Sequence, residues 1–318
     1  MLCQTQIRTL TQGQLTYAID NDDFFAGPFT SGFEGYAFSA GDEIYVNGDL
    51  NSTTPTSNWD WISPTIGTQL NLPSDRVSKL LYILNEFACP THKGNIDQNI
   101  PYDESESLDF ARIQEVFESE PGGILSSSYM APGYMIDYPL GAGPPAERLT
   151  GRRQWNDFKL RWEIDRRFGP FDTPFSAPRR YRWRVSQVGV QASEKAVVLD
   201  GSRYYTSGDG LDTDVSTLPG LYGPFSDGGP TFASSRAYAR PWITRPGGIV
   251  QGDLTNFLLS VRHNRAVNMG FFDGHVELVQ EIDLYSNPVP MHPGGSTYTG
   301  SQATPEIAAA YETGDVLP

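Results

Sequence analysis

Positive charge and cysteine are both scarce in this chain of 318 residues. It has 23 Lys and Arg against 38 Asp and Glu, a formal net charge of −15. General nucleic-acid binding needs a basic surface that neutralises phosphates, so this balance argues against it. Two cysteines exclude a small domain held together by several disulfides, and they form no C-x-x-C pair of the kind that binds zinc.

Long hydrophobic runs are missing as well. No stretch approaches the ~18 apolar residues that a helix needs to cross a bilayer. Gly and Pro are abundant, at 32 and 24, and aromatic residues make up 12% of the chain. A disordered segment lacks aromatic residues, so the composition predicts a folded, loop-rich domain with much β structure. One domain with insertions fits better than two.

The few basic residues are unevenly placed. Between Arg148 and Arg184 there are 11 Lys or Arg against four acids, so the rest of the chain is strongly acidic. A chain polarised in this way can pair its basic patch with the acidic surface of another copy. The residues that we expect to carry such self-association are Arg179, Arg180, Arg182 and Arg184. A solvated, Arg-rich face is the alternative.

Apolar spacing predicts several elements along the chain. A helix is expected over residues 1–20, ended by the acidic turn formers at 20–23, and it has no N-cap signal at its start. Further helices are expected over 74–87, capped by Ser74, and over 108–119 and 155–168. A strand and its turn are expected over 126–135, a buried strand over 196–201, and a long surface excursion over 206–248.

The clearest local pattern is a β-hairpin near the C-terminus. Asp273-Gly274 lies between two apolar segments and supplies the positive φ angles of a tight turn. His263 precedes Asp273 by ten positions, which gives the spacing H-x(9)-D-G.

This motif and its surroundings resemble the prepilin-type processing-associated H-x(9)-D-G family, which is related to type IV pilins and to the pseudopilins of type II secretion. Four other pieces occur in the order that the family has them: Cys3-Gln4-Thr5-Gln6-Ile7-Arg8 with Tyr17-Ala18 and Asp20-Asn21, Cys89-Pro90, Ser128-Tyr129-Met130, and Leu199-Asp200-Gly201. The resemblance implies an α+β, pilin-like fold in which an N-terminal helix packs on an antiparallel β-sheet, with long loop-rich insertions.

On this resemblance, residues 1–23 are the solvent-exposed remainder of a pilin-type helix, and residues 24–318 form the head, including a hairpin over 266–280. Family members begin with a basic leader, a cleavage site, a Glu and about 20 apolar residues, and none of these occurs in residues 1–318. Either this anchor was removed, with Met1 as an added start, or the chain is an anchorless relative. We favour removal.

Candidate chemistry is limited. His263 and Asp273 could be a catalytic pair or half of a metal site, but a straight strand would separate them by roughly 30 Å. We therefore expect Asp273 to hold the turn and His263 to bond a neighbouring loop. His275 and Glu277 point to one face, and His92 and His292 are expected to be exposed polar residues in loops, which argues against zinc.

Calcium is the one cofactor that the sequence suggests. Asp209, Asp212 and Asp214 lie in a Gly-containing loop whose carboxylates suit calcium, although their spacing departs from that of an EF-hand. The family resemblance adds that pseudopilins often carry calcium in loops of the head.

The cysteines leave two alternatives open. Cys3 and Cys89 could form one disulfide that closes a long loop, worth about 4 kcal/mol of stability, or they could be two unpaired buried thiols.

We therefore expect a bacterial, extracytoplasmic structural subunit of a type IV pilus-like filament or type II secretion pseudopilus, anchored in the inner membrane before assembly. It would act by assembly with copies of itself and other pilin-like subunits, not as an enzyme. The alternatives are a secreted carbohydrate-binding or adhesive module, favoured by Trp59, Trp61 and the Tyr-rich loops, and an extracellular hydrolase, for which the sequence identifies no pair of carboxylates.

Overall fold

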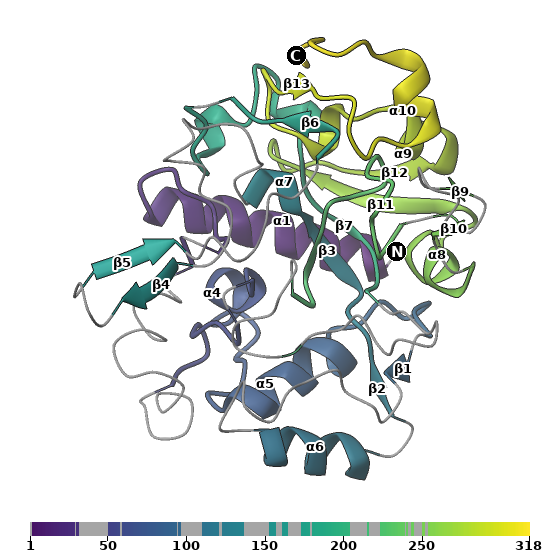
Figure 1. Cartoon of the computed structure of the whole chain (residues 1–318). Helices are drawn as coiled ribbons and strands as arrows, with labels where there is room; N and C mark the ends of the chain where they lie inside the picture. The colour runs from purple at the N-terminus through teal and green to yellow at the C-terminus, as the bar shows by residue number, and fades with distance from the viewer. Residues whose placement is uncertain are drawn as a thin grey trace.

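A computed structural model of the chain (Figure 1) describes residues 2–28, 30–31, 50–57, 59–93, 95–96, 110–120, 123–136, 153–156, 161–164, 173–178, 180–203, 215, 223–238, 240, 243–244, 250–251 and 254–318. All structural statements below concern these residues. Helices and a largely antiparallel sheet are mixed in an α+β arrangement, as the sequence predicts. The division of the chain at residue 23 stays a prediction.

The N-terminal helix α1 spans Leu2–Asp20, close to the predicted range. It ends where the acidic turn formers begin, and Asp22 and Asp23 take positive φ angles of 53° and 73° that no helix can continue. The Asp23 carboxylate accepts a hydrogen bond from the amide of Ser186 at 3.1 Å, which fixes the chain directly after the helix. In the part of the chain that is described, no helix is long and apolar enough to cross a membrane.

The main sheet has five strands in the order β12-β11-β7-β3-β8. Strands β12 (Val276–Gln280), β11 (Ala266–Phe271), β7 (Ala196–Asp200) and β3 (Tyr129–Pro132) pair antiparallel, and β8 (Ser226–Asp227) pairs parallel with β3. Strand β7 is buried at every position, as expected of an apolar central strand. The sheet is thus assembled from segments that lie far apart in the chain.

Helix α1 covers one face of this sheet, where it contacts β11 and β7. The side of α1 that faces away from the sheet packs against α4 (Ile62–Ile66). Two glycines permit this close fit. A Cβ at Gly270 of β11 would lie 2.0 Å from the Thr11 hydroxyl oxygen, and one at Gly13 of α1 would lie 2.3 Å from Cγ2 of Ile66. The helix is therefore held between two layers.

A second apolar cluster fills the opposite face. It joins Met130, Leu199 and Met269 of the sheet to Phe257 of α8 (Leu254–Ser260) and Tyr285 of α9 (Glu281–Ser286). The sheet is consequently covered by helices on both sides, which accounts for the complete burial of β11.

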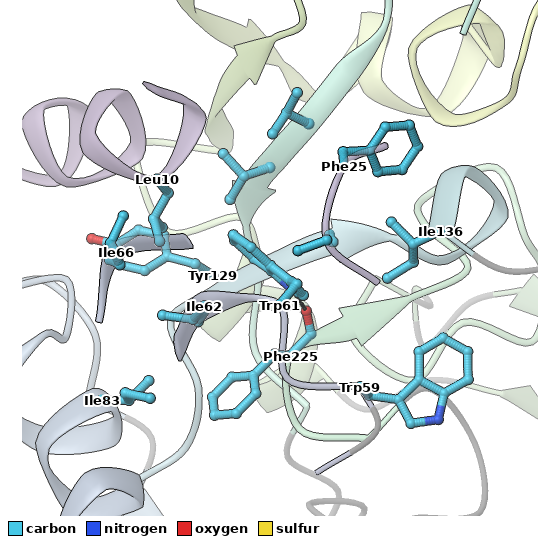
Figure 2. Close-up of a cluster of buried hydrophobic side chains, with 14 of the residues drawn as sticks. Leu10, Phe25, Trp59, Trp61, Ile62, Ile66, Ile83, Tyr129, Ile136 and Phe225 are labelled. Carbon is cyan, nitrogen blue, oxygen red and sulfur yellow. Dashed lines mark hydrogen bonds between the residues drawn. The ribbon is translucent and has the colours of Figure 1, made fainter. Parts of the chain in front are cut away.

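The largest cluster lies between α1 and the segments that follow it (Figure 2). Trp61 is fully buried there and donates its indole N–H to the Phe225 carbonyl at 2.7 Å, beside Leu10, Ile66 and Tyr129. Helices α5 (Arg76–Leu81) and α6 (Phe110–Ser119) lie at the end of the molecule away from the C-terminal elements (Figure 1). A π-helical segment, Tyr82–Glu86, continues α5.

The C-terminal hairpin is confirmed. Strands β11 and β12 pair with Met269 opposite Glu277, and Gly274 turns the chain with a φ of 92°. Asp273, which was expected to share the positive φ, does not have one. Three further pairs of short strands are β1 (Asn95–Ile96) with β2 (Ile124–Leu125), β6 (Phe175–Ser176) with β13 (Thr297–Tyr298), and β9 (Ile243–Thr244) with β10 (Val250–Gln251). The other short elements are the 3₁₀ turns Val185–Gln187, Ala192–Glu194 and Val289–Met291, and helix α10 (Pro305–Ala310).

Three local predictions are wrong. Where residues 155–168 are described, the expected helix is absent: strands β4 (Arg153–Asn156) and β5 (Arg161–Ile164) pair there, with Trp155 opposite Trp162. Aromatic residues favour strands. The turn expected at 133–135 is the short helix α7 (Gly133–Ile136). The N-cap of α5 is Asp75, whose carboxylate accepts the Ser78 amide at 2.8 Å, and not Ser74.

The surface excursion expected over 206–248 is also contradicted where it is described. Phe225 and Tyr238 are fully buried, and Ser226–Asp227 joins the sheet. The Asp227 carboxylate makes this burial possible, because it accepts hydrogen bonds from the Ser235 hydroxyl and from the amides of Gly229, Arg236 and Ala237.

The contact at Gly270 can be tested by a pair of substitutions. Gly270→Ala should destabilise the protein by about 1–3 kcal/mol, because the added methyl group pushes α1 away from the sheet. Thr11→Ala should cost little, since the Thr11 hydroxyl has no hydrogen-bond partner among the described residues. Chemical denaturation should show that the double variant recovers part of the loss; a double variant as unstable as Gly270→Ala alone would contradict the contact.

Candidate functional site

One buried carboxylate brings together the separated sequence landmarks. Asp200 ends β7 on the face that α1 covers, and its side chain is fully buried. Its Oδ1 accepts a hydrogen bond from Arg262 Nη2 at 2.7 Å. Its Oδ2 accepts three, from His263 Nε2 at 3.1 Å and from the backbone amide and side-chain Nδ2 of Asn268 at 2.7 and 2.8 Å. We call Asp200, Arg262, His263 and Asn268 the Asp200 centre.

The sequence places these groups for local reasons. Strand β11 pairs with β7 so that Asn268 lies beside Asp200, two positions before the Gly270–Val198 pair. Asn264 and Arg265 take positive φ angles of 56° and 61°, and this turn between α8 and β11 presents Arg262 and His263 to the end of β7. Asn tolerates such a left-handed backbone better than most residues.

Charge pairing decides the ionisation of Asp200. Burial by itself raises the pKa of this carboxyl group. The Arg262 guanidinium and the hydrogen bonds from His263 and Asn268 outweigh burial, so the pKa lies below its ordinary value. Asp200 is therefore an ionised, fully hydrogen-bonded carboxylate within the fold.

The first turn of α1 and the Cys89 segment adjoin this centre. Cys3 and Cys89 form a disulfide, one of the two alternatives that the sequence leaves open, and His263 Nε2 lies 3.6 Å from Cys89 Sγ. The Ser128 hydroxyl accepts the Cys89 amide at 3.1 Å, and the Ser128 carbonyl accepts Arg262 Nη2 at 2.7 Å. Each of the five pieces on which the family resemblance rests thus has at least one residue at this location.

Helix α1 is linked to the same location by a polar contact. The Tyr129 hydroxyl donates to Gln6 Oε1 at 2.6 Å, and Gln6 Nε2 donates to the Ala88 carbonyl at 3.2 Å. Because Tyr129 pairs with Asp200 across β3 and β7, α1 is held to the strand that ends in the buried carboxylate.

The two motif residues His263 and Asp273 do not meet. His263 lies at the Asp200 end of β7, whereas the chain next to Asp273 lies at its other end, where the Phe272 amide donates to the Lys195 carbonyl at 3.0 Å. Asp273 Oδ1 accepts from the His275 amide at 3.1 Å and contacts His275 Nδ1 at 2.5 Å. Each residue therefore supports its own end of the strand, and neither has the other as a catalytic partner.

The predicted calcium ligands and the predicted self-association patch are not among the residues that define the Asp200 centre. The predicted calcium ligands Asp209, Asp212 and Asp214 lie outside the described residues, as does Arg179 of the predicted self-association patch. Arg180 and Arg182 of that patch are exposed, and Arg184 is partly buried, with its guanidinium 4.3 Å from the ring centre of Phe24.

The expectation for His92 and His292 is wrong, because both are buried. His92 Nε2 lies 2.9 Å from the Ser126 hydroxyl. His292 stacks on Tyr134, with ring centres 4.6 Å apart and planes at 14°, and its two ring nitrogens have no hydrogen-bond partner within the described residues. Burial lowers the pKa of each to about 3, so both rings are neutral.

Metal binding has one candidate group in the described part of the chain. The donor atoms of Cys3, Cys89 and His263 lie within 4.8 Å of one another. The disulfide, however, removes both thiolates that a metal would need, and His263 Nε2 is engaged with Asp200. In this state the cluster is not a metal site.

The role of Asp200 as a buried carboxylate that joins separate segments was not predicted from the sequence. An acid at the end of a buried apolar strand is a signal that it needs a buried cation, and Arg262 beside the motif histidine is the natural candidate. The Asp200 carboxylate accepts from four donors and has no exposure, so it is closed to a substrate and suited to holding segments together.

In comparisons with known proteins, the chain matches no family model, no curated protein and no solved structure.

Replacing the buried carboxylate tests the Asp200 centre. Asp200→Asn should cost about 3–5 kcal/mol of unfolding free energy, because Arg262 is left buried without a counter-charge. The matched control Asp273→Asn breaks only an exposed pair and should cost about 1 kcal/mol or less. Because folding lowers the Asp200 pKa, its contribution is full above the unfolded-state pKa and is lost as pH falls through the folded-state value. Equal costs for the two variants would contradict the centre.

The buried histidine predicts a second pH effect. The pKa of His292 is about 3 in the folded chain, below its ordinary value of 6.5, so its contribution to stability falls as pH drops from about 6.5 toward 3. His292→Phe keeps the aromatic stack and removes the titration. Thermal unfolding between pH 7 and 4 should show a flatter pH dependence for His292→Phe than for the parent; parallel curves would overturn this assignment.

Proposed function

We propose that this protein is the head of a pilin-like or pseudopilin-like subunit and that it acts by assembly, not by catalysis. The observation that carries the proposal is the joining of α1 to the sheet and to the H-x(9)-D-G hairpin. The helix packs on β11 and β7, and Cys3 ties its first turn to Cys89, beside the motif residue His263. A helix held so firmly to its head suits a subunit that is built into a filament through that helix.

The outer surface of α1 supports this function. The sheet and α4 cover two sides of the helix, while a stripe at three- and four-residue steps stays exposed: Leu2, Thr5, Arg8, Gln12, Thr16 and Ile19. Leu2 and Ile19 are 56% and 82% exposed. Such a stripe offers a surface on which the helix of a neighbouring subunit can pack.

The disulfide supports an extracytoplasmic location. Structural disulfides form and persist in oxidising compartments such as the periplasm and the cell surface. In the proposed form, a membrane-spanning segment would precede α1 and hold the subunit in the inner membrane of a bacterium before assembly.

Charge provides the proposed lateral contact. The chain carries a net charge of −15, so identical heads repel one another unless a basic region lies against an acidic one. Arg180 and Arg182 are exposed and belong to the most basic stretch of the sequence. Copies of the chain and other pilin-like subunits are the proposed partners.

The two tryptophans that favoured a carbohydrate-binding module are not available for binding. Trp59 and Trp61 are 6% and 0% exposed, and Figure 2 shows both within the cluster of buried side chains. A stacking platform for sugars needs exposed rings, so these two residues serve the core.

Charge reversal tests the proposed self-association. Arg180→Glu with Arg182→Glu should lower the sedimentation coefficient at high protein concentration and low salt, because the attraction between basic and acidic surfaces is lost. The control Lys93→Glu, compared with the single variant Arg180→Glu, makes the same charge change at another exposed position and should associate like the parent. A parent chain that stays monomeric, or equal association in both variants, would contradict the proposal.

A further inference from the structure

The disulfide lies at the edge of a cavity. A hollow of about 370 Å³ is lined by Cys3, Thr91 and His263, with Leu2, Pro90 and Leu278 as apolar walls. Cys3 lines the cavity, whereas Cys89 lies deeper, with an exposure of 1% against 6% for Cys3. A small molecule in the cavity would therefore meet Cys3 before Cys89.

The surroundings of Cys89 suit a thiolate. Thr91 Oγ1 lies 3.1 Å from Cys89 Sγ and can donate a hydrogen bond to it, and His263 Nε2 lies 3.6 Å away. His263 Nε2 lies 3.1 Å from Asp200 Oδ2 and 3.6 Å from Cys89 Sγ, so the ring stands beside the sulfur that leaves. Neighbouring hydrogen-bond donors stabilise the thiolate form of cysteine.

From these two observations we propose that Cys3–Cys89 is a site of thiol–disulfide exchange with a small-molecule thiol, in which Cys3 is attacked and Cys89 leaves. The thiolate of the small molecule forms a bond to Cys3 Sγ, the S–S bond of the protein breaks, and its electron pair goes to Cys89 Sγ. The product is a mixed disulfide on Cys3 and a Cys89 thiolate beside His263 and Thr91. A second thiolate then attacks the sulfur of the small molecule, which releases Cys3 as a thiolate and the small-molecule disulfide.

The exchange would break the disulfide between α1 and the Cys89 segment and leave the other contacts of α1 with the head intact. The hydrogen bond between Tyr129 and Gln6 and the packing of α1 on the sheet do not involve the sulfurs. Reduction therefore loosens the first turn of the helix without removing the helix from the head. This inference does not depend on the proposed filament function.

Glutathione is the probe for the order of attack. The folded chain is incubated with reduced and oxidised glutathione at graded ratios, quenched in acid, alkylated and mapped by mass spectrometry. The expected trapped species carries glutathione on Cys3 and the alkyl group on Cys89, and circular dichroism stays that of the folded chain. Glutathione on Cys89, or opening only under conditions that unfold the chain, would overturn the proposal.

A pair of histidine variants tests the leaving group. His263→Gln should slow glutathione-dependent opening by about tenfold, because the leaving thiolate loses its stabilising neighbour. His275→Gln removes an exposed histidine at the hairpin turn and should leave the rate unchanged. Equal rates for His263→Gln and the parent would refute the role of His263. If His263→Gln does not fold, Thr91→Val is tested instead and should also slow the opening, because it removes the hydrogen-bond donor to Cys89. The position of glutathione on the parent chain tests the attack on Cys3 without any variant.

Discussion

The structure depends on one buried negative charge. An ionised carboxylate inside a protein costs several kcal/mol unless cations and hydrogen-bond donors surround it. Asp200 obtains Arg262 and His263 from the turn before β11 and Asn268 from β11 itself. Each of these donors comes from a different position of one segment, so satisfying the charge also fixes how that segment docks on β7.

This requirement extends to the N-terminal helix. The Ser128 carbonyl shares Arg262 with Asp200, and the Ser128 hydroxyl holds the amide of Cys89, which is bonded to Cys3 of α1. Helix, sheet and hairpin are therefore joined through a short series of polar and covalent contacts at one end of β7. The packing of α1 between the sheet and α4 buries much of its apolar surface. The polar contacts and the disulfide fix where α1 lies along the sheet.

Much of the framework could be predicted from the sequence because its signals are local. The hairpin turn requires a positive φ at Gly274 and lies between apolar segments, and the residues after α1 favour a turn. The helices over 110–119 and 2–20 follow from the spacing of apolar residues. The hairpin formed by β4 and β5 was not predicted, because Phe158 and Trp162 are spaced one helical turn apart, a local signal that favours a helix. In the structure Trp162 instead pairs with Trp155 across the two strands.

The candidate site could be predicted only in part, since its partners are distant in the chain. The family resemblance marked Cys89, Asp200 and His263 as landmarks, but no local pattern indicates that a residue at 200 binds residues at 262 and 263. The burial of His292 was equally hidden, because its aromatic neighbours Tyr134 and Phe175 come from remote segments. Pairing across more than 60 positions is decided by the assembled sheet and not by sequence neighbours.

A double-mutant cycle tests most directly that the motif histidine belongs to the Asp200 centre. His263→Gln is combined with Asp200→Asn in one cycle and with Asp273→Asn in another, and unfolding free energies are measured by denaturant titration. We expect a coupling of about 1–3 kcal/mol between His263 and Asp200 and additivity between His263 and Asp273. Additivity in the first cycle, or a coupling of similar size in the second, would contradict this expectation.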